Sequence, residues 1–103
     1  MNCSKPARLS VERLREAANT LRLLAHPDRL KLIECMERDG ALPVHMLTGR
    51  LGLPQATVSC HLARLRAAGL VVAERRGKEV RYRIGDPRAL AVLHCVRKGA
   101  PAR

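Results

Sequence analysis

Apolar residues recur at the three- and four-residue spacing of a helix along most of this 103-residue chain. Ser10 precedes such a stretch and is a suitable N-cap for a first helix that runs to about Leu24. Pro27 is well placed to begin a second helix, which ends at Gly40. Two further helices are predicted over 43–51 and 54–68, separated by a glycine turn.

After Gly69 the spacing of apolar residues changes from that of a helix to that of a strand. Residues 70–84 alternate around a Gly77-Lys78 turn, which predicts a β-hairpin. Asp86 then caps a last helix that runs to about Lys98. The fold class is therefore mainly α with a β-hairpin, in the order α-α-α-α-β-β-α, which is that of a winged helix-turn-helix.

We expect one folded domain over residues 10–98, with short flexible ends at 1–9 and 99–103. Twenty Lys and Arg against nine Asp and Glu give a net charge of +11, which favours a polyanionic partner. The sequence has neither an apolar run long enough to span a membrane nor the apolar stretch of a signal peptide, so a cytoplasmic location without membrane contact is expected.

The fourth predicted helix carries small hydrogen-bonding side chains at its start, where a reader of the DNA major groove needs them. Gln can pair with adenine, Thr and Ser can bond bases or phosphates, and the helix amino end attracts a phosphate. The simpler alternative is an ordinary solvated helix face. The candidate DNA-binding residues of this helix are Gln55, Ala56, Thr57, Ser59, Cys60, His61 and Arg64.

The predicted hairpin carries more basic than acidic side chains, and such side chains suit phosphates or a minor groove. Alternating arginines are also typical of a solvated strand face, and the two interpretations are compatible. The candidate DNA-binding residues of the hairpin are Arg75, Arg76, Lys78 and Arg81.

Three segments in order, 21–33, 51–70 and 75–84, closely resemble the ArsR/SmtB family of bacterial winged-helix repressors, and the likeness covers about residues 15–97. The resemblance implies a homodimer joined through its first and last helices. It also implies binding to double-stranded DNA at an imperfect palindromic operator and release by an inducer. No cofactor is then required for binding DNA.

The inducer has to be sought among the cysteines, because two familiar metal sites of the family are absent. Cys35 and Cys95 fall at the borders of the apolar stripes of the second and last helices, so we expect both to be semi-exposed. This layout resembles the family's dithiol sensors of persulfide and oxidants, although in those sensors the first thiol aligns with Glu34. Cys35 and Cys95 are therefore the candidate effector-sensing residues.

Two alternatives for these thiols remain open. They can be ordinary core residues, or they can bind a soft metal or metalloid inducer such as As(III), Cu(I) or Zn(II) together with Cys3, His45 or His94. A role for the whole chain as a protein-interaction module is the alternative of another class, and it predicts a neutral or acidic recognition face and wing, contrary to the arginines present on both. Enzyme activity is not expected, because adjacent Cys and His residues on a helix do not face each other.

Overall fold

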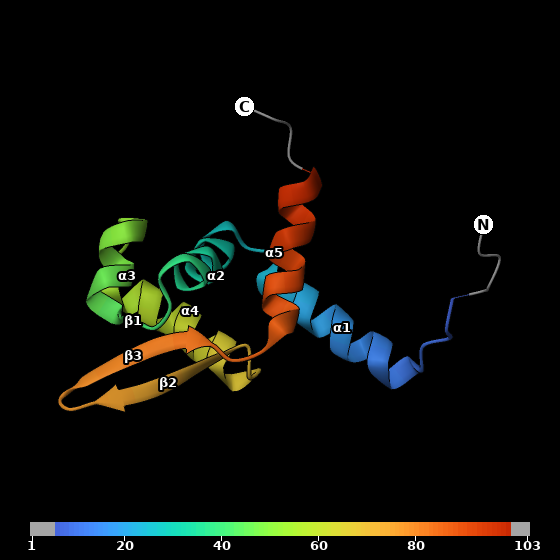
Figure 1. The fold of residues 1–103 in the computed structure, drawn as a ribbon, viewed down its shortest axis with the longest axis horizontal. Coiled ribbons are helices and arrows are strands. Elements are labelled where there is room, and N and C mark those ends of the chain that lie inside the picture. The colour runs from blue at the N-terminus through green and yellow to red at the C-terminus, as the bar shows by residue number, and fades with distance from the viewer. Residues whose placement is uncertain (1–5, 100–103) are drawn as a thin grey trace.

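The computed structural model describes residues 6–99, which form five helices and a small antiparallel sheet, arranged as in Figure 1. The predicted ends at 1–9 and 99–103 fall in part on residues 1–5 and 100–103, which lie outside the described residues, as does Cys3. The elements are α1 (Val11–Leu24), α2 (Pro27–Asp39), β1 (Leu42–Pro43), α3 (Val44–Leu51), α4 (Gln55–Ala67), β2 (Val71–Arg76), β3 (Glu79–Ile84) and α5 (Pro87–Gly99).

The helix starts lie where the capping residues predict them. The Ser10 hydroxyl accepts the Arg13 N–H at 3.1 Å, and the Asp86 carboxylate accepts the Arg88 N–H at 2.9 Å. These bonds satisfy amide groups that have no partner within the helix. Gly40 ends α2 at a positive φ of 75°, a conformation that glycine adopts without a steric penalty.

The sheet has a third strand that the sequence pattern did not predict. Leu42 and Pro43 pair with Tyr82 and Arg81, and the strand order is β1-β3-β2. A two-residue strand is too short to show alternation, and proline is tolerated here because β1 lies at the sheet edge. The predicted hairpin is confirmed, with Val71 opposite Ile84 and Arg76 opposite Glu79.

The core lies where α2, α3, α4 and the base of the hairpin meet, and α5 packs against α2. Leu32, Leu47 and Leu62 are among its almost fully buried side chains. The chain passes from the hairpin to α5 through Gly85, where a Cβ atom would lie 2.8 Å from the Val72 side chain. This close approach brings the end of β3 against the start of β2 at the base of the hairpin, or wing.

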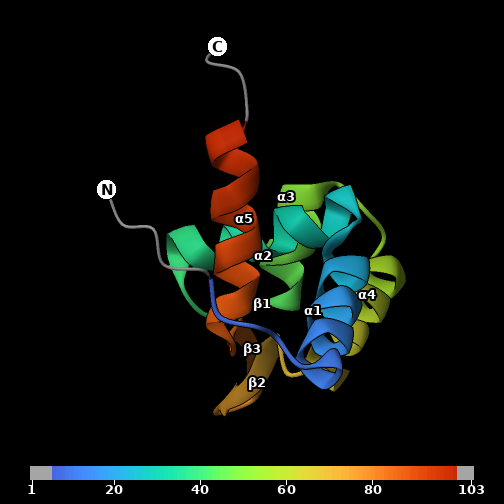
Figure 2. The ribbon, with the colours of Figure 1, turned by 90° about the vertical axis from the view of Figure 1, so that its right-hand side faces the viewer.

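Helix α1 lies along the outside of this body, as Figure 2 shows. Of its residues only Thr20 and Leu24 are buried, whereas Leu14 and Leu21 are 50% and 54% exposed. Val96 of α5 lies three residues from the buried Leu93, at helical spacing, yet it is 51% exposed. The apolar stripes of these two helices therefore extend beyond what the body of one chain covers.

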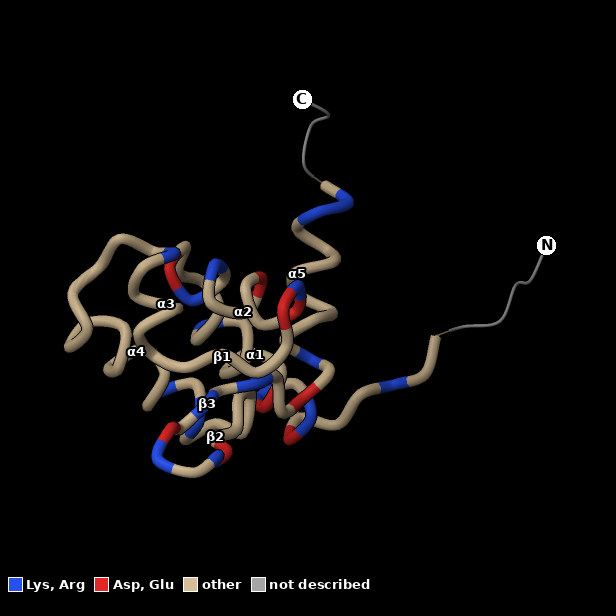
Figure 3. Tube along the Cα trace, turned by 60° about the vertical axis from the view of Figure 1, so that its left-hand side comes forward, with Lys and Arg blue, Asp and Glu red and all other residues tan. Residues whose placement is uncertain are grey.

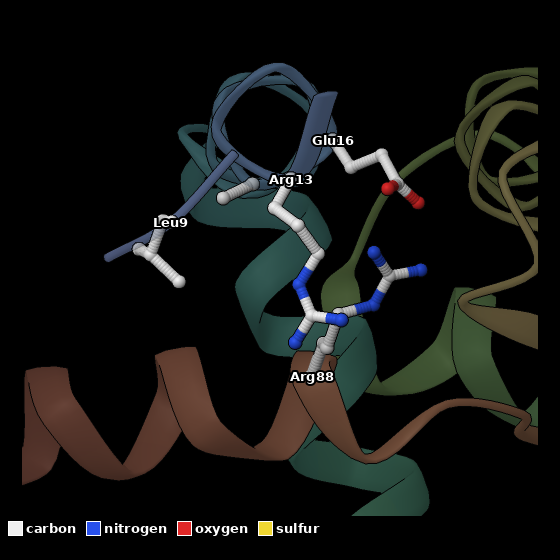
Figure 4. Close-up of a pocket in the computed structure, with 5 residues that line it drawn as sticks. Leu9, Arg13, Glu16 and Arg88 are labelled. Carbon is white, nitrogen blue, oxygen red and sulfur yellow. The ribbon is translucent and has the colours of Figure 1, made fainter. Parts of the chain in front are cut away.

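A hollow of about 390 Å³ separates the start of α1 from the start of α5. Arg13 and Arg88 extend into it from the two helices, beside Leu9 and Glu16 (Figure 4).

Among the described residues, no helix is both long enough and apolar enough to cross a membrane.

Candidate nucleic-acid interface

Helix α4 is the second helix of the helix-turn-helix, and its inner face is apolar as predicted. Val58, Leu62 and Leu65 are at most 1% exposed. Gly52, in the left-handed conformation at φ 66°, ends α3 and lets the chain turn into α4. One side of α4 therefore faces the core through four buried residues, Val58, His61, Leu62 and Leu65. The other side of the helix is exposed.

The exposed side of α4 has a ridge of small residues with polar residues on both flanks. At 100° per residue, Gln55, Ser59 and Arg66 lie on one flank, while Thr57 and Arg64 lie on the other. Small side chains allow a helix to approach another surface closely, and polar flanks can bond to it. The residues of the ridge are Ala56, Cys60, Ala63 and Ala67, all exposed.

The amino end of α4 adds backbone donors to this surface. Its N-cap is Pro54, and no side chain there accepts a hydrogen bond from the first turn. The amide groups of that turn remain available to an anion, which the helix dipole also favours. Gln55, Ala56 and Thr57 occupy this turn.

His61 was expected among the residues that contact DNA, but the structure places it on the buried side of α4. It is 8% exposed, and its Nδ1 accepts a hydrogen bond from the Arg29 Nε at 3.1 Å. The cause is its position beside Leu62 and Leu65, which face the core. We therefore exclude His61 from the DNA-facing surface, and burial lowers the pKa of its imidazole.

His61 also belongs to a group that could hold a metal ion by spacing alone, together with His26 and Asp28. The hydrogen bonds argue for a structural role. The His26 Nδ1 accepts the Asp28 N–H at 3.1 Å and caps α2, while the His61 Nδ1 accepts from Arg29. Each neutral ring then carries its proton on Nε2, and a guanidinium lies beside the group, so a cation is disfavoured.

Two of the basic wing residues are neutralised within the wing. The Arg81 Nε donates to Glu79 at 2.8 Å and the Arg83 Nε donates to Glu74 at 2.7 Å. Within residues 6–99, Arg75, Arg76 and Lys78 have no such ion pair, and all three are exposed. The wing tip therefore carries the available positive charge, and Arg81 is tied to a carboxylate.

One face of the wing lies toward α4. Tyr82 shares a hollow of about 410 Å³ with Ser59, Arg66 and Ala67. Alternation along β2 and β3 places Arg75 on the same face as Tyr82. Arg66 and Tyr82 were not among the predicted site residues, because only the packed sheet shows that the wing borders α4.

Figure 3 shows how the charges are distributed over the interface. The first nine residues of α4 carry no Asp, Glu, Lys or Arg, whereas the wing tip is strongly charged. A neutral polar surface that is flanked by cations suits DNA, since bases are read by neutral donors and acceptors and phosphates by cations.

The two candidate sensing thiols do not face each other within one chain. Cys35 is 4% exposed rather than semi-exposed, and it lies beside Arg50, which pairs with Asp39 on the α3 side of α2. Cys95 is exposed and lies two residues from Leu93, which is buried, and hence roughly 160° around α5 from it. Both Cys35 and Cys95 are free thiols.

The side of α2 that faces α5 carries two glutamates. Glu34 and Leu93 line one hollow, and Glu37 accepts hydrogen bonds from His94 at 2.8 Å and Arg97 at 2.9 Å. The Arg97 bond, followed by the His94 bond, lowers the pKa of Glu37. A thiol at position 34, where the dithiol sensors have theirs, would face α5. Cys35 is one residue further along α2, so it lies against α3 instead.

Comparisons with known proteins identify the relatives of this chain. The family model for bacterial regulatory proteins of the arsR type matches residues 26–72. The transcriptional repressor SmtB of Mycobacterium tuberculosis is 43% identical over 81 residues, which make up 79% of this chain and 59% of SmtB. The transcriptional repressor PagR of Bacillus anthracis is 35% identical over 80 residues, covering 78% of this chain and 80% of PagR.

Solved structures agree with these relatives. The crystal structure of PagR matches with a TM-score of 0.77 at 32% identity, covering 84% of this chain and 99% of that one. A homodimeric winged helix-turn-helix DNA-binding domain from Mycobacterium bovis matches with a TM-score of 0.73 at 26% identity, covering 90% of this chain and 88% of that one. The predicted winged-helix fold is confirmed.

Proposed function

The chain belongs to the ArsR family of bacterial regulatory proteins, whose relatives here are repressors and not enzymes, and we propose that it is a homodimeric repressor of transcription. In this proposal it binds double-stranded DNA at an imperfect palindrome and is released by a thiol-directed inducer. The observation that carries the DNA-binding role is the exposed face of α4, where a ridge of small residues has polar residues and a cation on each flank.

Helix α4 would lie in the major groove with its amino end toward the bases. Gln55 and Ser59 would bond base edges, and the backbone amides of the first turn would bind a phosphate. The remaining DNA-facing candidates are Ala56, Thr57, Cys60 and Arg64 on α4, and Arg75, Arg76, Lys78 and Arg81 on the wing. Of the wing residues we assign the phosphate contacts chiefly to Arg75, Arg76 and Lys78, which have no carboxylate partner within residues 6–99.

The dimer would form through α1 and α5. Leu14 and Leu21 of α1 and Val96 of α5 are each about half exposed, and a helix with so little buried surface gains stability from a second partner. A related domain from Mycobacterium bovis is homodimeric. Residues 10–98 would thus serve as one DNA-binding and dimerisation domain, and two-fold symmetry of the dimer matches a palindromic site.

Induction would act through thiols. Cys95 is exposed and available to persulfides, oxidants or thiophilic metals, whereas Cys35 is enclosed between α2 and α3. A bridge between these two thiols in one chain requires α2 or α5 to move, since disulfide partners need Cα atoms within about 7 Å and facing side chains. The proposal therefore predicts that Cys95 reacts first and Cys35 only after the body opens.

A salt titration tests the DNA-binding role. Affinity for promoter DNA, measured by fluorescence anisotropy, should fall steeply and linearly on logarithmic axes as salt rises. Binding that is insensitive to salt, or no binding, would refute the proposal and favour a protein-interaction module. An Arg75→Ala, Arg76→Ala double variant should have a shallower slope, with Arg38→Ala as a control of equal charge change per substitution.

Mass spectrometry tests the inducer class. The protein is treated separately with persulfide, arsenite and zinc, and the modified cysteine is identified alongside DNA affinity. Loss of DNA binding by persulfide in the parent but not in Cys95→Ser supports sulfur sensing, whereas the same pattern with arsenite or zinc supports a metal-type inducer. Equal responses of the parent, Cys35→Ser and Cys95→Ser exclude both thiols.

A further inference from the structure

A second basic hollow lies beside α4, on the flank opposite the wing. Three arginines from three helices line it, Arg22 of α1, Arg29 of α2 and Arg64 of α4, around a volume of about 500 Å³. None of its described lining residues is acidic. Guanidinium groups from separate elements that converge without a carboxylate form a site for an oxyanion.

The three guanidiniums retain donors for such a ligand. The Arg29 Nε donates to His61 and one of its terminal nitrogens donates to the Leu23 carbonyl, each at 3.1 Å, which fixes the half-buried side chain and leaves its other terminal nitrogen unused. Arg22 makes one bond, to Asn19 at 3.0 Å. Arg64 makes no side-chain hydrogen bond or ion pair with residues 6–99.

The position of the hollow indicates its ligand. Ala67, on the exposed ridge of α4, lines both this hollow and the one that Tyr82 of the wing borders. Both flanks of the ridge therefore carry cations, Arg66 on the wing side and Arg64 on the other. A helix in the major groove, which is about 12 Å wide, has a row of phosphates on each side of it.

We infer that Arg22, Arg29 and Arg64 form a phosphate clamp that binds the DNA strand on the side of α4 away from the wing. The inference deepens the proposed function and depends on it. The wing tip would hold one strand and the clamp the other, so that α4 is fixed from both sides in the groove. Arg29, already immobilised by two hydrogen bonds, would lose little side-chain entropy on binding.

The experiment measures the salt dependence of DNA affinity for the parent, Arg22→Ala, Arg64→Ala and Arg38→Ala. Arg22 and Arg64 are exposed and outside the core, so their removal leaves the fold intact, which thermal unfolding checks. Each substitution removes two phosphate contacts per dimer, so the slope of log K against log salt should fall by about 1.8. Affinity at 0.1 M salt should fall on the order of 50-fold by the same relation.

Arg38→Ala, on an exposed arginine at the far end of α2, removes the same charge and should leave the slope unchanged. A random-sequence duplex should show the same differences, because phosphate contacts do not depend on sequence. If the parent fails to bind DNA, the proposed function fails. If the parent binds but Arg22→Ala and Arg64→Ala keep its slope, only the clamp is overturned.

A last arm distinguishes DNA phosphates from a free anion in the same hollow. Inorganic phosphate replaces chloride at constant ionic strength, and NMR shifts of the arginine side chains report binding. Phosphate bound at Arg22 and Arg64 together with unchanged DNA slopes in the variants would assign the hollow to a small anion and overturn the inference. Slopes reduced by the variants, with no saturable phosphate binding, support the clamp.

Discussion

Replacing Leu14 and Leu21 by alanine tests whether the exposed face of α1 joins two copies of the chain. Both residues are only about half covered by their own chain, with exposures of 50% and 54%. Leucine and alanine both favour helix, so α1 keeps its intrinsic propensity in the variant. The substitution therefore removes apolar surface that residues 6–99 of one chain leave uncovered and a partner can bury.

The expected loss follows from that exposure. Full burial of a leucine side chain contributes about 1.5–3 kcal/mol, so burying the exposed half contributes about 1 kcal/mol. Two-fold symmetry doubles each contribution, to about 2 kcal/mol per substitution. The two leucines lie seven residues apart, about 10 Å along the helix, so their effects should add to about 4 kcal/mol, or roughly 1000-fold in dimer dissociation.

Sedimentation equilibrium over a wide range of protein concentration measures the dissociation constant. Met46→Ala is the matched control, because Met46 is 40% exposed but lies on α3, outside the proposed interface. The reasoning fails if the Leu14→Ala, Leu21→Ala variant dissociates within threefold of the parent. It also fails if Met46→Ala weakens the dimer as much.

Three further predictions concern stability and the recognition helix. Gly85→Ala should destabilise the fold by about 1–3 kcal/mol in urea unfolding, because its Cβ would lie 2.8 Å from Val72, whereas Gly49→Ala, with open space around it, should not. Burial lowers the pKa of His61 below its ordinary 6.5, so the unfolded chain takes up a proton first. The unfolding midpoint should therefore fall as pH drops below 6.5, and His61→Asn should flatten that dependence, whereas an unchanged dependence would assign it to other groups. Iodoacetamide should abolish DNA binding of a Cys95→Ser variant but not of a Cys60→Ser, Cys95→Ser double variant, and equal loss in both would place Cys60 away from the DNA.

Local signals were sufficient for most of the fold. Ser10, Pro27 and Asp86 each determine a helix start through their own hydrogen bonds or ring geometry, so the sequence alone locates those starts. Strand β1 was missed because its pairing depends on β3, some forty residues later in the chain. The structure supplied that long-range contact, which alternation within two residues cannot reveal.

Positions at the border of an apolar stripe were the main source of error. A helical wheel locates the centre of a stripe, but it does not show how many neighbours cover the helix. Cys35 is buried because α3 covers that border of α2, and His61 is buried because it lies on the core side of α4, where Arg29 of α2 also contacts it. Val96 belongs to the apolar stripe of α5 and is nevertheless exposed, because no element within residues 6–99 covers that side of the helix.

Helix α1 connects dimerisation to the proposed grip on DNA. Its outer face carries Leu14 and Leu21, while Arg22 near its end lines the basic hollow beside α4. A helix of fourteen residues with two buried side chains is marginal by itself, so a partner that covers the leucines also stabilises the turn that holds Arg22. Loss of the dimer should then weaken DNA binding for two reasons. The two α4 helices are no longer joined, and the turn of α1 that positions Arg22 beside α4 is less stable.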